Sequence, residues 1–125
     1  MLKKEKCIER YFNMWLSKDG SSLNEIFDRN IIYSECYGPE YRGIEKIVKW
    51  FDDWNKRGTV IKWDIKQFIH QANQTVIEWY FECEFDGEVS GFDGVSIIEF
   101  NADGKIKDIK EFQSKAEHEF PYNRV

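Results

Sequence analysis

The chain has 125 residues, a length that fits one domain built around one hydrophobic core. Hydrophobic residues make up 42% of it and charged residues 33%, which excludes both a disordered chain and a membrane-spanning one. The net charge is −5 and the lysines alternate with acidic residues, so no basic face is available to bind nucleic acid.

Apolar runs, the N-terminal residues and the cysteines indicate the location of the protein. No run approaches the roughly 20 apolar residues of a membrane span, and the charged start at residues 1–6 is not followed by the apolar stretch of a signal peptide. Three cysteines, an odd number placed far apart, favour a reducing compartment. We therefore expect a cytoplasmic protein.

The first part of the chain predicts helices. Apolar side chains at helical spacing in residues 8–16 predict an amphipathic helix that stops at residues 19–20. A capping-box pattern at residues 22–25 predicts a short second helix, and Gly43 and Gly58 bracket a third. The expected buried residues are Ile8, Tyr11, Phe12, Trp15 and Leu16, then Leu23, Ile26 and Phe27, then Ile44, Ile47, Val48, Phe51 and Trp54, with Trp50 at the edge.

The rest of the chain alternates as strands do. One strand is expected between the helices at residues 31–36, and four more follow at residues 59–70, 75–85, 91–101 and 106–114. Asp-Gly pairs after the third and fourth of these five strands suit tight hairpin turns. Because helices come first and strands follow, we expect an α+β fold with a curved antiparallel sheet.

Alternation assigns faces to the long strands. Ile61, Trp63 and Ile65 are expected on one face of their strand. The odd-numbered residues of 75–85 form the expected core face, and Tyr80 stands among three glutamates on the other. The next strand should place Phe92, Gly94, Ser96, Ile98 and Phe100 together on the core face.

Two segments carry a resemblance to a known family. Residues 37–47 resemble the loop and G-x-x-x-I entry into the third helix of the nuclear transport factor 2-like superfamily. Residues 92–106 resemble its F-x-G-x-S…F-x-x-D-G-K-I hairpin, and the likeness, closest to the SnoaL-like branch, spans roughly residues 5–115. It implies a single cone-shaped domain over residues 1–125, with three N-terminal helices wrapped around a cavity at the wide end. Homodimers through the outer sheet face are also implied. Superfamily members include isomerases, dehydratases, cyclases, transport adaptors and non-catalytic subunits, so the resemblance addresses fold more than function.

Carboxylates are the candidate catalytic groups. Ketosteroid isomerases of this superfamily use a carboxylate at the end of the first strand as general base, and Glu35 in the similar segment 34–43 lies nearest to it. Glu is longer than the Asp usual there, the spacer differs by one residue, and Ser96 replaces the isomerases' protonated acid, so the full isomerase set is absent. SnoaL-like cyclases rely on cavity acids, which draws attention to Asp93, although alternation turns Asp93 outward unless a bulge intervenes. Glu111 is a third candidate, with its direction left open.

Aromatic residues make up 17% of the chain, more than a core of this size needs, and they also line ligand cavities and interfaces. The expected ligand-contacting residues are Tyr11, Trp15, Tyr33, Trp50, Trp54, Trp63, Trp79, Phe81, Ser96 and Phe112. Most of the tryptophans are equally well explained as core residues, and Tyr11 or Tyr33 either donates a hydrogen bond in the cavity or is a satisfied core tyrosine.

No metal or cofactor is expected. His70 and His118 are the only histidines, neither has a ligand partner at metal-site spacing, and no glycine-rich phosphate loop precedes a helix.

Two interpretations remain open. The first is a cofactor-free lyase, isomerase or cyclase acting by acid–base chemistry on a small apolar or aromatic carbonyl compound. The second is a non-catalytic ligand-binding or dimerising module whose cavity is filled by its own aromatic side chains.

Overall fold

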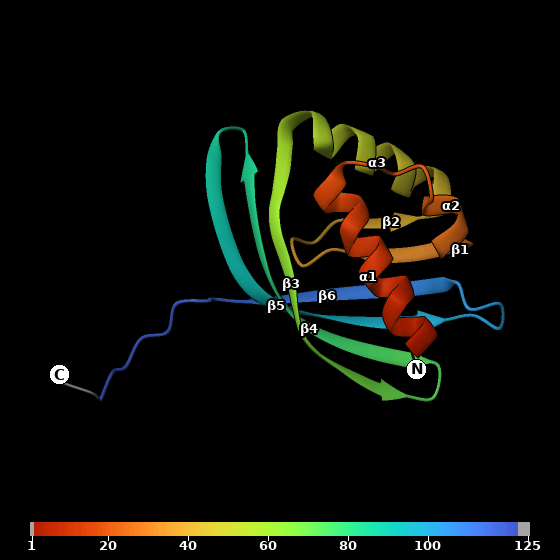
Figure 1. Ribbon diagram of the computed structural model, residues 1–125. Helices are drawn as coiled ribbons and strands as arrows, with labels where there is room; N and C mark the ends of the chain where they lie inside the picture. Colours follow the sequence, from red (N-terminus) through yellow and green to blue (C-terminus); the bar gives the residue numbers. More distant parts are fainter. Residues whose placement is uncertain (1, 123–125) are drawn as a thin grey trace.

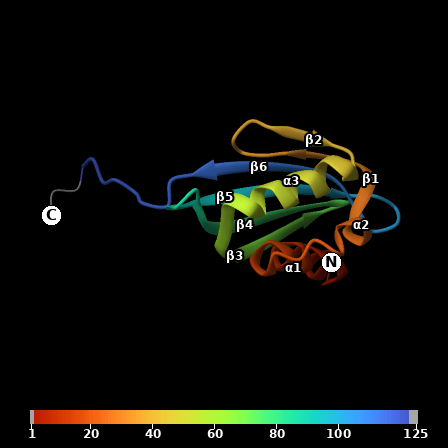
Figure 2. The same cartoon turned by 90° about the horizontal axis from the view of Figure 1, so that it is seen from above.

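The protein folds as a bent sheet with helices on it, as the computed structural model of residues 2–122 shows (Figure 1). Helix α1 crosses in front of the sheet and α3 lies along its upper end in that view. After the last strand the chain extends away from the body in both views (Figure 2). The elements are α1 (Leu2–Ser17), α2 (Leu23–Ile26), β1 (Phe27–Ser34), β2 (Glu40–Arg42), α3 (Ile44–Arg57), β3 (Gly58–Gln71), β4 (Gln74–Phe85), β5 (Glu88–Phe100) and β6 (Ile106–Ser114).

The six strands form one mixed sheet in the order β2-β1-β6-β5-β4-β3. All neighbours are antiparallel except β1 and β6, which run parallel with Tyr33 opposite Ile109. The α+β architecture with a curved sheet is confirmed, and the expectation of a purely antiparallel sheet is corrected at this one pair. Hairpin turns set the directions of β3 to β6, whereas no hairpin joins β1 to β6, so that pairing is free to be parallel.

The buried stripe of α1 forms largely as its spacing predicts. Ile8, Tyr11, Phe12 and Trp15 are all buried. Leu16 was expected with them but is 38% exposed, because in the last turn it is the neighbouring positions that face the core. The buried apolar side chains other than Cys83 join one continuous cluster between helices and sheet.

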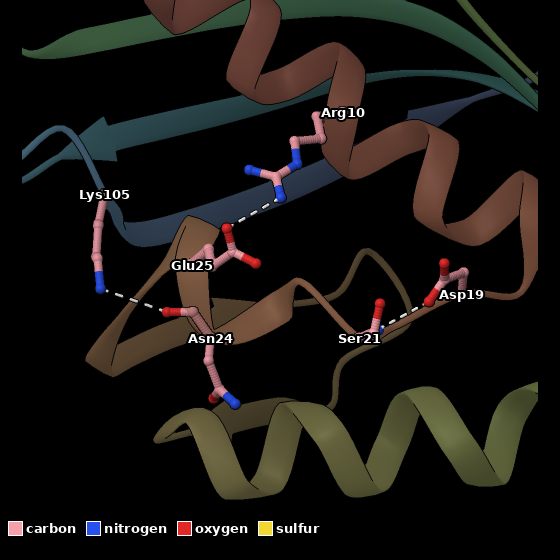
Figure 3. Close-up of polar contacts among 6 residues, drawn as sticks. All are labelled: Arg10, Asp19, Ser21, Asn24, Glu25 and Lys105. Carbon is pink, nitrogen blue, oxygen red and sulfur yellow. Dashed lines mark hydrogen bonds and ion pairs between the residues drawn. The ribbon is translucent and has the colours of Figure 1, made fainter.

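The capping box expected at the start of α2 does not form. Ser22 makes no side-chain cap, and its expected partner Glu25 instead accepts a hydrogen bond from Arg10 of α1 at 3.2 Å (Figure 3). An Asp19 oxygen accepts from the Ser21 backbone N–H at 3.0 Å, and Lys105 Nζ donates to the Asn24 carbonyl at 3.4 Å (Figure 3). The polar groups around this short helix therefore tie it to α1 and to the β5–β6 turn, rather than capping it. Phe27, expected in the helix, begins β1.

Gly58 ends α3 as expected, but by a different means. Its φ of −137° is extended, so it is not a left-handed cap. A Cβ there would lie 2.8 Å from the Phe85 ring and 2.9 Å from Trp54. A glycine is therefore needed for the close approach of these two rings.

A bulge changes the faces of β3. Its register against β4 shifts between Val60 and Lys62, so one extra residue is inserted there. Val60 and Trp63 consequently face the core, while Ile61, expected beside Trp63, is 40% exposed. The core face of β4, by contrast, follows simple alternation: Thr75, Ile77, Trp79 and Cys83 are buried as expected.

Candidate functional site

A cavity of about 590 Å³ opens between α3, the end of β1, the β2 segment and the concave face of the sheet. Aromatic residues supply 11 of its 21 lining residues, and all five tryptophans of the chain are among them. A cavity of this size and character is typical of a site for a small organic molecule.

Most of the expected ligand-contacting residues lie at this cavity. Those that line it are Trp15, Tyr33, Trp50, Trp54, Trp63, Trp79 and Phe81. Three others do not. Tyr11 is buried beside Tyr33, and Ser96 is buried and accepts a hydrogen bond from Trp79 Nε1 at 2.9 Å. Phe112 is 55% exposed and lies outside the lining.

The position of Glu111 follows from an irregularity in β6. Ile106 pairs with Phe100 but Asp108 pairs with Glu99, so Lys107 is an extra residue in the strand. Beyond it, Ile109 and Glu111 share the inward face, and Phe112 turns outward. Glu111 therefore projects its carboxyl group into the cavity from the centre of the sheet.

The Glu111 carboxyl is held by a chain of two buried tyrosines. Tyr11 Oη donates to Tyr33 Oη at 2.8 Å, and Tyr33 Oη donates to Glu111 Oε2 at 2.6 Å. Removal from water raises the pKa of Glu111 to about 8; the bond from Tyr33 opposes this rise, and the charge of Glu35 adds to it. Burial and the nearby Glu111 likewise raise the pKa of Tyr11 and of Tyr33. Near neutral pH, Glu111 is thus a neutral acid.

Glu35 follows β1 and also lines the cavity. It accepts a hydrogen bond from Tyr41 Oη at 2.8 Å, and the Tyr41 ring is stacked on Trp50 at 4.6 Å. Burial raises the pKa of Glu35, and the bond from Tyr41 opposes that rise. The two cavity carboxyls are therefore in different environments: Glu111 in the wall of buried tyrosines, Glu35 at the less buried side.

Asp93 lies elsewhere. It is on the outer face of β5, as alternation indicates, and its carboxylate pairs with Lys66 Nζ at 2.9 Å. It is not among the residues that line the cavity. The structure brings together two of the three candidate carboxylates and separates the third from them.

Several lining residues carry no sequence pattern that predicts their position. Tyr41 is one, because β2 was not expected and its face was unknown. Arg57 and Glu88 are others, since they lie at the ends of elements, where periodicity carries no information, and Asp53 is an exposed residue within α3, outside its predicted buried stripe. The cysteines Cys36 and Cys83 also line the cavity.

Burial raises the pKa of the Cys36 thiol to about 12 and also raises that of Cys83, so neither is poised as a thiolate nucleophile. Among residues 2–122, no group of three or more His, Cys, Asp and Glu side chains is arranged to hold a metal ion. No helix in this part of the chain is long and apolar enough to cross a membrane.

Bent sheet, covering helices and aromatic cavity together define a small-molecule-binding cone fold whose substrate is unknown. The chain belongs to the SnoaL-like domain family, whose model matches residues 8–109. A search of curated proteins finds no match.

Solved structures show the same fold at low sequence identity. An LEH-like epoxide hydrolase from M. tuberculosis superposes with a TM-score of 0.81 at 12% identity, covering 90% of this chain and 84% of that one. A protein of ketosteroid isomerase-like fold from Catenulispora acidiphila, in complex with trimethylamine, superposes with a TM-score of 0.76 at 13% identity. The match covers 88% of this chain and 85% of that one. A candidate polyketide cyclase from Xanthomonas campestris superposes with a TM-score of 0.74 at 10% identity. The match covers 90% of this chain and 91% of that one. At these identities the likeness establishes the fold alone.

Proposed function

We propose that the cavity binds a small, largely apolar carbonyl compound and catalyses proton transfer on it without a cofactor. The observation that carries this proposal is that Glu35 and Glu111 line one aromatic cavity in environments that set the pKa values of their carboxyl groups apart. Pairs of titratable groups tuned apart in this way are a common basis for dividing the roles of acid and base.

Glu35 is the proposed general base. Its raised pKa makes its carboxylate a stronger base than an exposed one, while it still ionises more readily than Glu111. It takes a proton from the carbon next to the substrate carbonyl, and the electron pair of that C–H bond moves onto the carbonyl oxygen. Returning the proton to another carbon gives an isomerisation; loss of a leaving group gives an elimination.

Glu111 is the proposed hydrogen-bond donor to that oxygen. Because Tyr33 donates to Oε2, the proton of the neutral acid is available on Oε1 for a donor bond to the substrate. A neutral acid placed where negative charge develops stabilises the transition state more than the ground state.

The size of the cavity supports a bound molecule over a filled hollow. Its volume of about 590 Å³ lies within the range of ligand pockets in proteins. Non-catalytic binding uses the same cavity, so the two candidate functions differ in whether Glu35 takes a proton, and activity measurements separate them.

Exchange of the α-hydrogens of cyclohexanone for deuterium in heavy water, followed by mass spectrometry, tests the proposed chemistry. The wild-type protein should accelerate the exchange above buffer, and Glu35→Gln should lower the accelerated rate by about 10²-fold or more. Asp93→Asn, the same kind of change on the outer face, should leave the rate unchanged. Equal accelerated rates for wild type and Glu35→Gln would exclude Glu35 as the base, and a wild-type rate no higher than that of buffer would leave the non-catalytic function.

We further propose that the protein is a cytoplasmic homodimer formed through the outer sheet face. That face carries Tyr80, whose hydroxyl donates to Glu82 at 2.9 Å, and the exposed Phe112. An aromatic and polar surface of this kind suits a subunit interface. Sedimentation at micromolar concentration tests it, and a monomer alone would exclude the dimer.

A further inference from the structure

The charges around the cavity are unbalanced. Acidic residues that line it are Glu35, Asp53, Glu88 and Glu111, whereas Arg57 is the only basic lining residue in the described part of the chain, residues 2–122. What a ligand experiences depends on which of these charges already have a partner.

The one lining cation is already used. The Arg57 guanidinium donates through Nε to Asp86 Oδ1 at 3.1 Å and through a second nitrogen to the other oxygen of the same carboxylate. This bidentate pair leaves Arg57 little capacity to attract an anionic ligand. Asp53 is compensated in turn by Lys49, whose Nζ lies 3.5 Å from it on the surface of α3.

Glu35 and Glu88 are the uncompensated carboxylates. Within residues 2–122, no Lys, Arg or His nitrogen lies within 4.0 Å of either carboxyl group. Among these residues the Glu35 carboxyl group has the Tyr41 hydroxyl as its hydrogen-bond partner. Both carboxylates make the potential at the cavity negative; Glu88 is exposed, whereas Glu35 is partly buried among walls of low polarity that weaken the screening of its charge by water.

The walls are also suited to a cation. The faces of aromatic rings attract positive charge, and Trp is the strongest of them. One wall residue already does so inside the protein: the Arg57 guanidinium carbon lies 4.8 Å from the centre of the Phe85 ring at the cavity mouth. All five tryptophans line the same cavity.

We propose that the cavity selects organic cations, so that its ligand carries an ammonium group attracted by Glu35 and Glu88 and by the aromatic faces. This inference rests on the proposed small-molecule site and narrows its ligand class. Compounds whose main charged group is a carboxylate or phosphate are disfavoured, because the cavity offers them no unpaired cation and two unpaired anions. In the proposed reaction, the substrate is a carbonyl compound that also bears a positively charged nitrogen.

Binding of three probes of similar size tests the inference. Phenyltrimethylammonium and tert-butylbenzene have the same shape and differ by one positive charge. Benzoate is an aromatic probe that carries one negative charge. Intrinsic fluorescence reports their binding directly, because every tryptophan lines the cavity. We expect the cation to bind at least 10-fold more tightly than tert-butylbenzene, as roughly expected for a desolvated cation on aromatic faces, and benzoate to bind most weakly.

Charge-neutral variants locate the source of the preference. Combining Glu35→Gln with Glu88→Gln should weaken binding of the cation by about 10-fold or more while changing that of tert-butylbenzene less than about twofold. Glu84→Gln is the control for the loss of a negative charge as such, since it removes one from an exposed position of β4 outside the cavity. It should change neither affinity by more than about twofold.

Each remaining outcome contradicts the inference in a recognisable way. Equal or tighter binding of tert-butylbenzene overturns the cation preference and leaves the small-molecule site intact. An equal loss of cation affinity in Glu84→Gln assigns the preference to net charge rather than to the cavity. Binding of none of the three probes contradicts both the preference and the proposed site.

Discussion

Glu111 shows how the surroundings of a single carboxyl group determine its chemistry. On the surface it would be an ordinary anion, but beside Tyr33 and out of water its pKa rises to about 8. Such a residue makes the folded protein less stable as the pH rises. Its carboxyl group ionises at a lower pH in the unfolded chain than in the folded protein, so rising pH favours the unfolded state.

The pH dependence of stability follows from this shift. The folded pKa is about 8 and the ordinary value is 4.5, so between these pH values only the folded state holds the proton. The contribution of Glu111 to stability is therefore complete below about pH 4.5 and declines as the pH rises to about 8, by at most ~1.4 kcal/mol per unit.

Glu111→Gln should remove that decline, because Gln does not titrate. Urea denaturation of both proteins at pH 5 to 9 gives the difference between their free energies of unfolding. The variant should gain relative to the wild type by roughly 1 kcal/mol per pH unit up to about pH 8. A difference that stays constant with pH would mean that Glu111 is ionised throughout.

Tyr33 is the residue that links this acid to the core. Tyr33→Phe removes the donor to Glu111 and leaves the buried Tyr11 hydroxyl without its acceptor. We expect a loss of stability of about 1–3 kcal/mol, together with a further rise in the pKa of Glu111, because the lost bond favoured the charged form. Tyr41→Phe is the control, since Tyr41 binds Glu35 instead. A Glu111 pKa that is unchanged or lower in Tyr33→Phe would contradict the hydrogen-bond chain.

At the scale of the elements, regular alternation was predictable and its interruptions were not. The core face of β4 and the outward direction of Asp93 follow from counting residues by two. Extra residues at Ile61 and Lys66 in β3 and at Lys107 in β6 shift the count within these strands. The extra residue at Lys107 places Glu111 in the cavity and Phe112 outside it, and no local sequence signal marks it.

Pairings between distant segments were equally hidden. β1 and β6 pair although most of the chain separates them in the sequence. β2 is a three-residue edge strand, which is too short to show a hydrophobic period. The capping box predicted for α2 does not form, and Glu25 instead accepts a hydrogen bond from Arg10 of α1. The resemblance to a known family supplied the cone, and the sequence patterns supplied the elements, but the relation of Glu35, Glu111 and Tyr41 required the structure.

Gly94 of β5 packs closely against Trp79, which lines the cavity. A Cβ at this position would lie 2.2 Å from the Trp79 ring and 2.7 Å from the Phe112 carbonyl oxygen. Trp79 is only 2% exposed, and the free space beside its ring is the cavity that it lines. Gly94→Ala should therefore destabilise the fold by about 1–3 kcal/mol and displace the indole into the cavity.

Thermal unfolding and tryptophan fluorescence measure the two effects together. Gln113→Ala, an exposed change directly opposite Gly94 in the sheet, is the control and should alter stability by less than about 0.5 kcal/mol. If Gly94→Ala were as stable as that control, the close packing of Trp79 against the sheet would be wrong.

At the scale of the whole molecule, the cavity exists because strands and helices close around it. The bent sheet supplies Trp79, Phe81 and Glu111, while α1 and α3 bring Trp15 and Trp50 over them. This enclosure shields the two carboxyl groups from water, and their raised pKa values are its consequence. The proposed acid–base function depends on the same shielding.

The most direct test of the account is the titration of the glutamate side-chain carboxyls by carbon-13 NMR in the intact protein. We expect one carboxyl with a pKa of about 8, absent from the spectrum of Glu111→Gln, and a second one with a pKa above 4.5, absent from that of Glu35→Gln. Titration of both carboxyls at or below 4.5 would mean that water reaches them freely, and would contradict the shielded acid–base pair on which the proposed function rests.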